Sequence, residues 1–194
     1  MLAAKTEARR QAIQRAIAWV EEKPVYLDTE TTGLTAKDEV VEIAVIDHDG
    51  GILVNELVRP ARKIPADATG IHGITNEMVA NALTWPVLWV SKVRPALFGR
   101  TIAIFNASFD LRMMVQSHGN MQEPYRTLRT VDVLDLYAKF YGEWDSIRRA
   151  YRYQSLEKAG KQCGIALPNA HRALADTLLT RELLIYMSRA NPDG

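Results

Sequence analysis

Three short apolar runs occupy the segment from residue 25 to residue 58. Val25 to Leu27 begins the first, Val40 to Ile46 forms the second and Ile52 to Val58 the third. Such runs of mainly β-branched and aromatic residues are typical of strands. Asp49-Gly50-Gly51 separates the last two runs, and Asp and Gly are characteristic hairpin residues. We therefore expect three antiparallel strands, which restricts the chain to folds that begin with a meander.

Beyond residue 58 the patterns alternate between helix and strand. We expect Asn106 to cap a helix that begins at Ala107, and Gly164 to end a helix that reaches Cys163. Hairpin strands followed by helix-flanked strands predict an α/β protein with a mixed five-stranded sheet flanked by helices. The expected strands span residues 101–105 and about 126–131, and the expected helices span residues 84–98, 107–118, 133–140, 156–163 and 172–188.

The N-terminal residues form a separate pattern. Residues 3–22 are polar and rich in Ala, with Ile13, Ile17 and Val20 at helical spacing, and Pro24 ends the pattern. The length of 194 residues fits one core better than two small ones. We predict an N-terminal helix extension over residues 1–23 and one domain over residues 24–190.

Composition and charge restrict the class of protein. Hydrophobic residues make up 47% and charged residues 24%, and no apolar run approaches the roughly 20 residues that span a bilayer. No secretion signal is evident, and Cys163 is the only cysteine, so we expect a cytoplasmic protein without membrane contact. The net charge of +1 argues against nonspecific coating of duplex DNA.

Acidic residues stand at the ends of the expected elements. Asp28 and Glu30 close the first apolar run, and side chains two apart on a strand share a face while Thr29 points away. Asp110 lies in the first turns of a helix, where the helix dipole favours a carboxylate. Each residue also has a purely structural alternative. Asp28 could cap the strand, Glu30 could lie in solvent, and Asp110 could be an ordinary charge at a helix N-terminus.

His171 and Asp176 are five positions apart, which is about 140° around a helix. They would not share a helix face, so we expect His171 at the helix start and Asp176 inside the helix. An ordinary surface-loop histidine is the alternative for His171. His48 and His118 match no pattern, and we expect both on the surface.

Four segments resemble, in order and rough spacing, the motifs of the DEDDh 3′→5′ exonucleases. This is the family of DNA polymerase proofreading subunits, ribonuclease T and oligoribonuclease. The matching segments are Leu27 to Leu34, Ile71 to Ile74, Asn106 to Asp110 and His171 to Asp176. The resemblance runs from about Pro24 to Tyr186 and implies a ribonuclease H-like fold. A Tyr at the position of Arg172 would have indicated the sister DEDDy group.

The resemblance also implies a two-metal site. Asp and Glu supply the hard oxygen ligands that Mg²⁺ or Mn²⁺ prefers. By resemblance, Asp28, Glu30 and Asp176 hold the first ion, Asp28 bridges to the second, and Asp110 serves the second directly or through water. His171 is the implied general base, because imidazole exchanges protons near neutral pH.

Substrate contacts follow from the same resemblance. Two residues, His72 and Ile74, would line the base pocket, although a buried turn is the alternative for this segment. Phe105 replaces a residue that is often polar in the family, which leaves nucleotide selectivity open. The other implied contacts to the terminal nucleotide are Thr31, Gly33, Leu34, Asn106 and Phe109.

These patterns predict a divalent-metal-dependent 3′→5′ exonuclease that hydrolyses single-stranded or frayed DNA 3′ ends to nucleoside 5′-monophosphates. A 3′→5′ exoribonuclease that trims RNA or short oligoribonucleotides is the close alternative, and a catalytically silent nucleic-acid-binding module is the second. The expected partners are single-stranded DNA or RNA 3′ ends. A homodimer is left open. A polymerase partner is not indicated, because the sequence stops at Gly194 soon after the last expected helix.

One further stretch, residues 141–153, alternates basic and aromatic side chains. Interleaved Arg and aromatic residues are typical of single-strand binding, where bases stack on aromatic rings. The same composition also occurs in partly buried connections, so both interpretations stay open. The residues concerned are Trp144, Arg148, Arg149, Tyr151, Arg152 and Tyr153.

Overall fold

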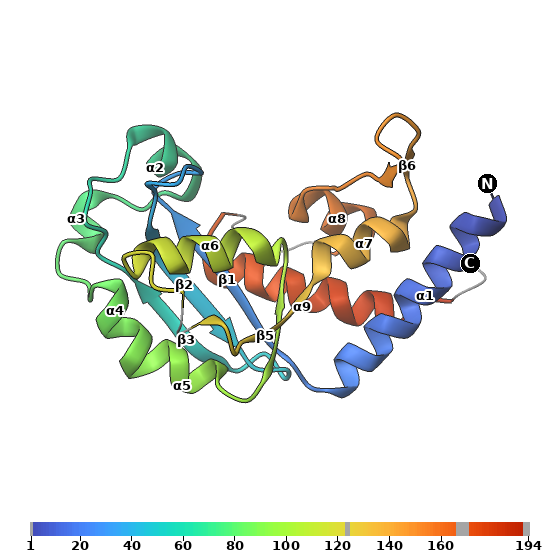
Figure 1. The fold of residues 1–194 in the computed structure, drawn as a ribbon, viewed down its shortest axis with the longest axis horizontal. Coiled ribbons are helices and arrows are strands. Elements are labelled where there is room, and N and C mark those ends of the chain that lie inside the picture. Colours follow the sequence, from blue (N-terminus) through green and yellow to red (C-terminus); the bar gives the residue numbers. More distant parts are fainter. Residues whose placement is uncertain (1, 123–124, 166–170, 192–194) are drawn as a thin grey trace.

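The fold is built on a mixed five-stranded sheet (Figure 1). The structure is a computed structural model that describes residues 2–122, 125–165 and 171–191. The strand order is β3-β2-β1-β4-β5; β1, β2 and β3 pair antiparallel, whereas β4 and β5 run parallel to β1. The predicted mixed sheet is confirmed. The strands are β1 (Val25–Thr31), β2 (Val40–Ile46), β3 (Ile52–Leu57), β4 (Thr101–Ile104) and β5 (Arg129–Asp132).

The expected helices all occur, and the helix expected over residues 84–98 contains a π-helical turn, η1. β5 begins later than the predicted strand near residue 126. Two short helices, α2 and α3, and a small hairpin, β6–β7, were not predicted. The elements are α1 (Leu2–Glu21), α2 (Ala66–His72), α3 (Asn76–Val79), α4 (Trp85–Leu88), η1 (Trp89–Val93), α5 (Arg94–Leu97), α6 (Ala107–Ser117), α7 (Val133–Tyr141), β6 (Trp144–Asp145), β7 (Ala150–Tyr151), α8 (Leu156–Gln162) and α9 (Ala173–Arg189).

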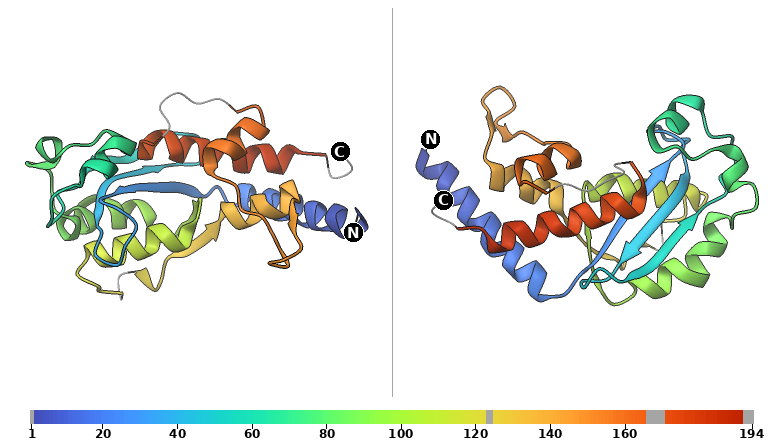
Figure 2. Two further views of the ribbon diagram at one scale, coloured as in Figure 1. Left: turned by 90° about the horizontal axis from the view of Figure 1, so that it is seen from above. Right: turned by 180° about the vertical axis from the view of Figure 1, so that it is seen from behind.

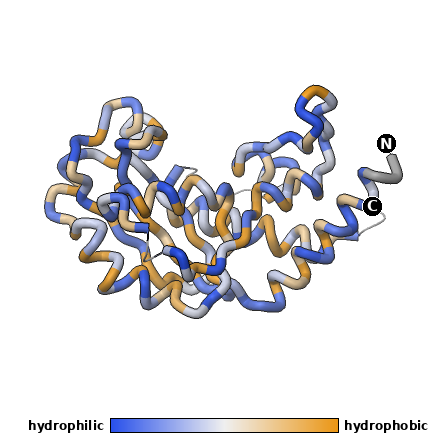
Figure 3. Tube along the Cα trace, in the orientation of Figure 1, coloured by the Kyte–Doolittle hydropathy of each residue, from blue (hydrophilic) through white to orange (hydrophobic). Residues whose placement is uncertain are grey.

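Helices cover both faces of the sheet, and Figure 2 shows α6 and α9 on opposite sides. Because side chains alternate along β1, Val25 and Leu27 pack with the α4–α6 layer, whereas Tyr26 packs with α1, α7 and α9. In the α6-side core, Trp85 and Trp89 are each 2% exposed, and Trp85 Nε1 donates a hydrogen bond to the Tyr125 hydroxyl at 2.7 Å. Figure 3 shows apolar residues concentrated in the strands and alternating with polar residues along the helices.

Helix α1 packs against α7 and α9. Ile13 and Ala16 are buried in the core that these helices share. The guanidinium of Arg9 lies 4.0 Å from the ring centre of Phe140, and its Nη1 donates to the Phe140 carbonyl at 3.0 Å. The expected N-terminal helix is therefore present, while the division between residues 23 and 24 stays a prediction.

The start of α6 differs from the expectation. Asn106 has a left-handed backbone with φ of 72°, and its side chain makes no capping hydrogen bond. Asp132 accepts instead from the backbone N–H groups of Asn106 and Ala107, at 3.2 and 3.1 Å. The same carboxylate caps α7 by accepting from Leu134 N at 2.9 Å. Asn106 thus occupies the predicted N-cap position, but its side chain does not cap the helix, because an acid from the neighbouring strand accepts from the backbone N–H groups there.

The two histidines expected on the surface are partly buried. His48 Nδ1 lies 3.4 Å from the Tyr26 hydroxyl, and His118 Nδ1 lies 2.9 Å from the Tyr125 hydroxyl. Burial lowers the pKa of both imidazoles. The surface prediction is wrong for both, because each ring hydrogen-bonds a buried tyrosine.

The residues that the structure describes contain no helix long and apolar enough to cross a bilayer.

Candidate active site

Three carboxylates gather where the end of β1 meets the beginning of α9. Asp28 and Glu30 come from β1 and Asp176 from the first turn of α9. One oxygen from each of the three lies within 4.8 Å of the others. Strand alternation predicted the shared face of Asp28 and Glu30, and that prediction is confirmed. This group is called the carboxylate cluster below.

Asp110 approaches from the other face of the sheet. It is 2% exposed, and its Oδ1 accepts a hydrogen bond from the Thr29 hydroxyl at 2.7 Å. Thr29 points away from its neighbours Asp28 and Glu30, as the alternation requires. Asp110 is not part of the cluster of three, but it lies close enough to Asp28 for its charge to raise the pKa of that carboxyl.

Burial and mutual repulsion disfavour the charged forms of these acids. The pKa of Asp28 is well above its ordinary value, first through burial and then through Asp110 and Asp176. Burial, assisted by Asp176, raises the pKa of Glu30 to about 8. Burial raises the pKa of Asp110 to about 7, against the lowering effect of the Thr29 hydroxyl. A bound cation would relieve both the repulsion and the desolvation.

His171 precedes α9 and is exposed. Its backbone is left-handed, with φ of 67°, which is unusual for a residue other than Gly. Burial raises the pKa of Asp176, while the charge and the backbone N–H of His171 act in the opposite direction. The expected arrangement, with His171 before the helix and Asp176 inside it, is confirmed.

An ion pair between a buried glutamate and a partly exposed arginine, which was not predicted, secures the beginning of α9. Glu42 of β2 lies opposite Glu30 in the sheet and is 3% exposed. Its oxygens accept from Arg172 Nε at 3.1 Å, from Arg172 Nη2 at 2.5 Å and from the backbone N–H of Ala173 at 2.9 Å. Glu42 therefore holds both Arg172, just before α9, and Ala173, the first residue of α9. A single Glu inside the apolar run 40–46 was the signal for this pair.

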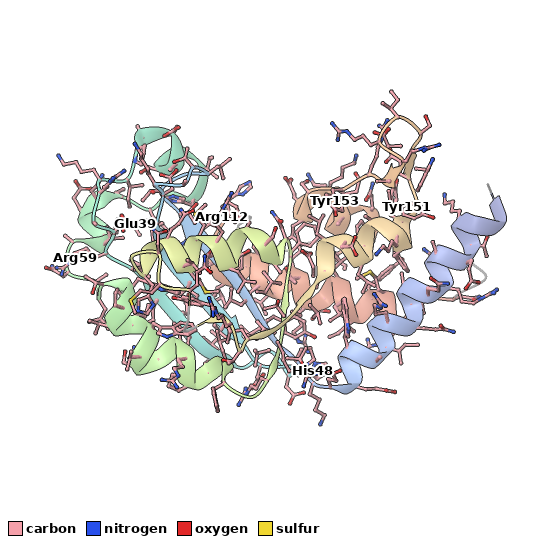
Figure 4. The ribbon with its side chains drawn as sticks, in the orientation of Figure 1. Glu39, His48, Arg59, Arg112, Tyr151 and Tyr153 are labelled. Carbon is pink, nitrogen blue, oxygen red and sulfur yellow. The ribbon has the colours of Figure 1, made fainter. Side chains whose placement is uncertain are left out.

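The predicted wedge residue Leu34 is 74% exposed, and Phe109 is half-buried at the beginning of α6. Between them lies Arg112, which was not predicted. Its guanidinium lies 5.4 Å from the Phe109 ring centre, and its Nη2 lies 3.5 Å from the Leu34 carbonyl oxygen. Figure 4 shows Arg112 extending from α6.

Two predicted substrate residues, Thr31 and Gly33, shape the loop after β1. Thr31 is buried, and its hydroxyl donates to the Gly33 carbonyl at 2.8 Å. A Cβ on Gly33 would lie 2.9 Å from the Asp38 carboxyl carbon, so a larger residue would force this loop to shift. Gly33 thus permits a close approach, here to Asp38.

His72 and Ile74 are both buried. His72 Nδ1 accepts from Ile74 N at 3.0 Å, which leaves Nε2 to donate to the Thr31 carbonyl at 3.2 Å. The Ile74 side chain packs in a small core with Val41 and Val79. Ile74 therefore lies in a buried turn, which was the alternative for this segment. His72 also lines a cavity of about 680 Å³ next to His171.

Residues 25–184 match the sequence profile of the Exonuclease family, RNase_T. The chain belongs to this family. The resemblance to DnaQ-like exonucleases that the motifs predicted is confirmed, and the protein is a nuclease that acts on nucleic acid.

Relatives in the Exonuclease family match most of this chain. It is 38% identical over 183 residues to Uncharacterized exonuclease CP81 of Escherichia phage 186, covering 91% of this chain and 93% of the phage protein. It is 34% identical over 166 residues to Exodeoxyribonuclease 10 of Escherichia coli (strain K12), covering 82% of this chain and 66% of the relative.

Among solved structures, Exonuclease X in complex with 5′-overhanging duplex DNA superposes with a TM-score of 0.64 at 29% identity. The match covers 84% of this chain and 89% of that one. The predicted ribonuclease H-like fold is confirmed by this likeness.

Proposed function

We propose that the protein is a 3′→5′ exonuclease that releases nucleoside 5′-monophosphates from single-stranded or frayed DNA. The observation that carries the proposal is the carboxylate cluster, with its oxygens within 4.8 Å of one another and Asp110 beside it. DNA is favoured over RNA because a relative is named an exodeoxyribonuclease and a similar structure contains duplex DNA.

The residues of the site fit divalent ions. Carboxylates are hard oxygen ligands. Buried acids this close together repel one another when they are all ionised, and a bound cation relieves that repulsion. Asp28, Glu30 and Asp176 would hold one ion, and Asp28 with Asp110 would hold the second, with Mg²⁺ or Mn²⁺ as the natural choice. Two ions in such a site supply an activated nucleophile and neutralise charge on the phosphate.

The chain itself supplies proton transfer and positioning. His171 is exposed at the beginning of α9, next to Asp176, where it removes the proton from the attacking water and passes it to solvent. The Glu42–Arg172 pair holds the backbone that carries both residues. Its role is positioning, because neither side chain belongs to the cluster.

The terminal nucleotide meets the rim of the site. Exposed Leu34 wedges against the last base, and Phe109 and Asn106 contact the same nucleotide from the start of α6. Contacts of this kind require an unpaired base, so single strands and frayed ends are the substrates.

The deciding experiment uses two 5′-labelled single strands of the same sequence, one DNA and one RNA, with Mg²⁺, Mn²⁺ or EDTA. We expect a metal-dependent ladder that shortens from the 3′ end of the DNA, absent for Asp176→Asn. A ladder on RNA alone would replace DNA by RNA as the substrate. Shortening from the 5′ end, or no degradation of either strand, would refute the proposal.

His171→Ala tests the general base. General acid–base groups contribute about 10²–10⁴-fold, and we expect kcat to fall within that range while the protein stays folded. The acid limb of the profile of kcat against pH should also disappear, because the imidazole whose deprotonation produces that limb is absent. An unchanged profile would remove His171 from this role.

A further inference from the structure

A short hairpin, defined here as the basic hairpin (residues 144–153), projects from the body between α7 and α8 (Figure 1). β6 and β7 are two residues each, and Trp144 pairs with Tyr151. Ile147 near its tip is 92% exposed. The loop is nevertheless held in place, because Asp145 Oδ1 accepts from the backbone N–H groups of Ile147 and Arg148 at 2.9 and 3.0 Å.

The hairpin carries more positive than negative charge, with three arginines and one aspartate over residues 144–153. Arg152 forms ion pairs with Glu143 and Asp145, at 3.4 and 3.5 Å. Arg148 and Arg149 are exposed, and neither takes part in an ion pair between described residues. Two guanidinium groups are therefore available to an anionic ligand.

Aromatic faces accompany these charges. Tyr153 is 64% exposed and Trp144 is 48% exposed, although Trp144 also makes an edge contact with Tyr151 at 5.1 Å between ring centres. Figure 4 shows Tyr151 and Tyr153 at the base of the hairpin, next to α7 and α8. A cavity of about 870 Å³ separates the hairpin from α7. Exposed aromatics among unpaired arginines match the chemistry of single-strand binding.

The hairpin leads directly to the catalytic region. Ser155 caps α8 by accepting from Lys158 N, and Glu157 lies in the first turn of α8. Glu157 lies close enough to both His171 and Asp176 to act on them electrostatically. Tyr153 is four positions before Glu157 in the chain. A strand whose 3′ end lies at Asp176 therefore has a short route past the beginning of α8 to the hairpin.

We propose that the basic hairpin is a second binding site for single-stranded DNA, which holds phosphates and a base of the substrate several nucleotides 5′ of the cleaved bond. Arg148 and Arg149 contact the phosphates, and Tyr153 stacks on a base. The inference rests on the proposed function, because the 3′ end must lie in the carboxylate cluster. It makes affinity depend on substrate length, which the cluster alone does not.

The test compares Arg148→Gln/Arg149→Gln with a matched control, Arg94→Gln/Arg100→Gln. The control removes the same charge from exposed residues in and after α5, at the opposite end of the molecule in Figure 1. KM and kcat are measured with Mg²⁺ on dT3 and dT20. The NaCl concentration is varied between about 50 and 200 mM, because affinity for nucleic acid changes steeply over this range. Thermal melting of each variant verifies that it is folded.

We expect the hairpin variant to raise KM for dT20 about tenfold, with kcat and all dT3 values unchanged. The slope of log KM against log salt should fall by about 1.4, since each phosphate contact to a single strand contributes about 0.7. Tyr153→Leu should raise KM for dT20 about fivefold without altering that slope. The control should match the wild type in every respect.

Two results would overturn the inference. If the hairpin variant and the control behave alike while the wild type degrades both substrates, the hairpin is no DNA site and the proposed function stands. If the hairpin variant loses activity equally on dT3 and dT20, the residues act on the catalytic site and not on a distant part of the strand. Absence of any degradation by the wild type would instead refute the proposed function itself.

Discussion

The two helices that bring acids to the candidate active site are secured in different ways. On the α9 side, a charged and partly exposed pair, Glu42 with Arg172, holds the beginning of the helix that carries Asp176. On the α6 side, the hydroxyl of Thr29 holds Asp110 inside a buried core. One half of the site therefore depends on charge and the other on packing and a neutral donor, so each half should lose its geometry under different conditions.

The largest effect is expected where the two halves meet, at Asp28. Asp28→Asn keeps the shape of the side chain but removes the charge that both halves share. Under the proposed assignment Asp28 is the ligand shared by both ions, so turnover should fall to background. Nucleotide release measures activity, and thermal melting at pH 8 should show no loss of stability, since a repelling charge is gone. Metal-dependent turnover near the wild-type level would contradict the assignment.

The Glu42–Arg172 pair should give the next largest effect. Glu42→Gln should reduce kcat about 10–100-fold, as substitutions of groups that orient ligands commonly do. Arg172→Ala leaves Glu42 buried without its cation, so it should cost more stability, on the order of 3–5 kcal/mol. Chemical denaturation measures that cost.

The double variant Glu42→Gln/Arg172→Ala provides the control for this pair. It should recover most of the stability lost in Arg172→Ala, because no unpaired charge stays buried, yet its kcat should stay low. If the double variant is less stable than Arg172→Ala, burial of an unpaired Glu42 is not the cause of the loss.

A smaller effect is expected on the α6 side. Thr29→Val keeps the volume but removes the hydroxyl that donates to Asp110. A hydrogen bond to a charged group contributes about 1.5–3 kcal/mol, so Mg²⁺ affinity and kcat should fall by about tenfold or more at low Mg²⁺. Thr29→Ser should behave like the wild type. Titration of activity with Mg²⁺ would decide the matter, and equal Mg²⁺ dependence in Val and Ser variants would argue against the contact.

The smallest effect concerns stability of the metal-free protein. The folded pKa values of Glu30 and Asp110, about 8 and about 7, lie above the ordinary values for carboxyls. Folding therefore binds protons, and the stability that these groups contribute at low pH is lost as the pH rises toward 8. We expect Tm in EDTA to fall by roughly 5 °C between pH 6 and pH 8.5. Mg²⁺ should abolish most of this slope, and a Tm that rises over the same interval would contradict the electrostatics.

The sequence predicted the parts of the site that follow from local geometry. Alternation along one strand predicted the shared face of Asp28 and Glu30, and helix geometry separated His171 from Asp176. It did not predict Glu42, because its partner Arg172 is 130 positions away, and a salt bridge at that separation depends on tertiary structure. Asn106 failed as a cap for the same reason, since Asp132 reaches it only in the folded sheet.

The sequence also did not predict that the basic hairpin is a hairpin. Two-residue strands are too short to show alternation, so only the interleaved composition of residues 144–153 marked the segment. Its turn is formed by Asp145, whose carboxylate accepts from two backbone N–H groups. The composition of this segment suggested its ligand chemistry. It did not predict which of its arginines form ion pairs with neighbouring acids and which do not.

Three of the four tryptophans lie in two contrasting optical environments, and the fourth, Trp19 of α1, is partly buried. Trp85 and Trp89 are each 2% exposed beneath α6, whereas Trp144 on the hairpin is 48% exposed. Their emission should therefore separate into a short-wavelength component from the interior and a long-wavelength component from the hairpin. With Trp19 replaced by Phe, a single unlabelled sample can thus report melting of the core and events at the hairpin independently, without any attached dye.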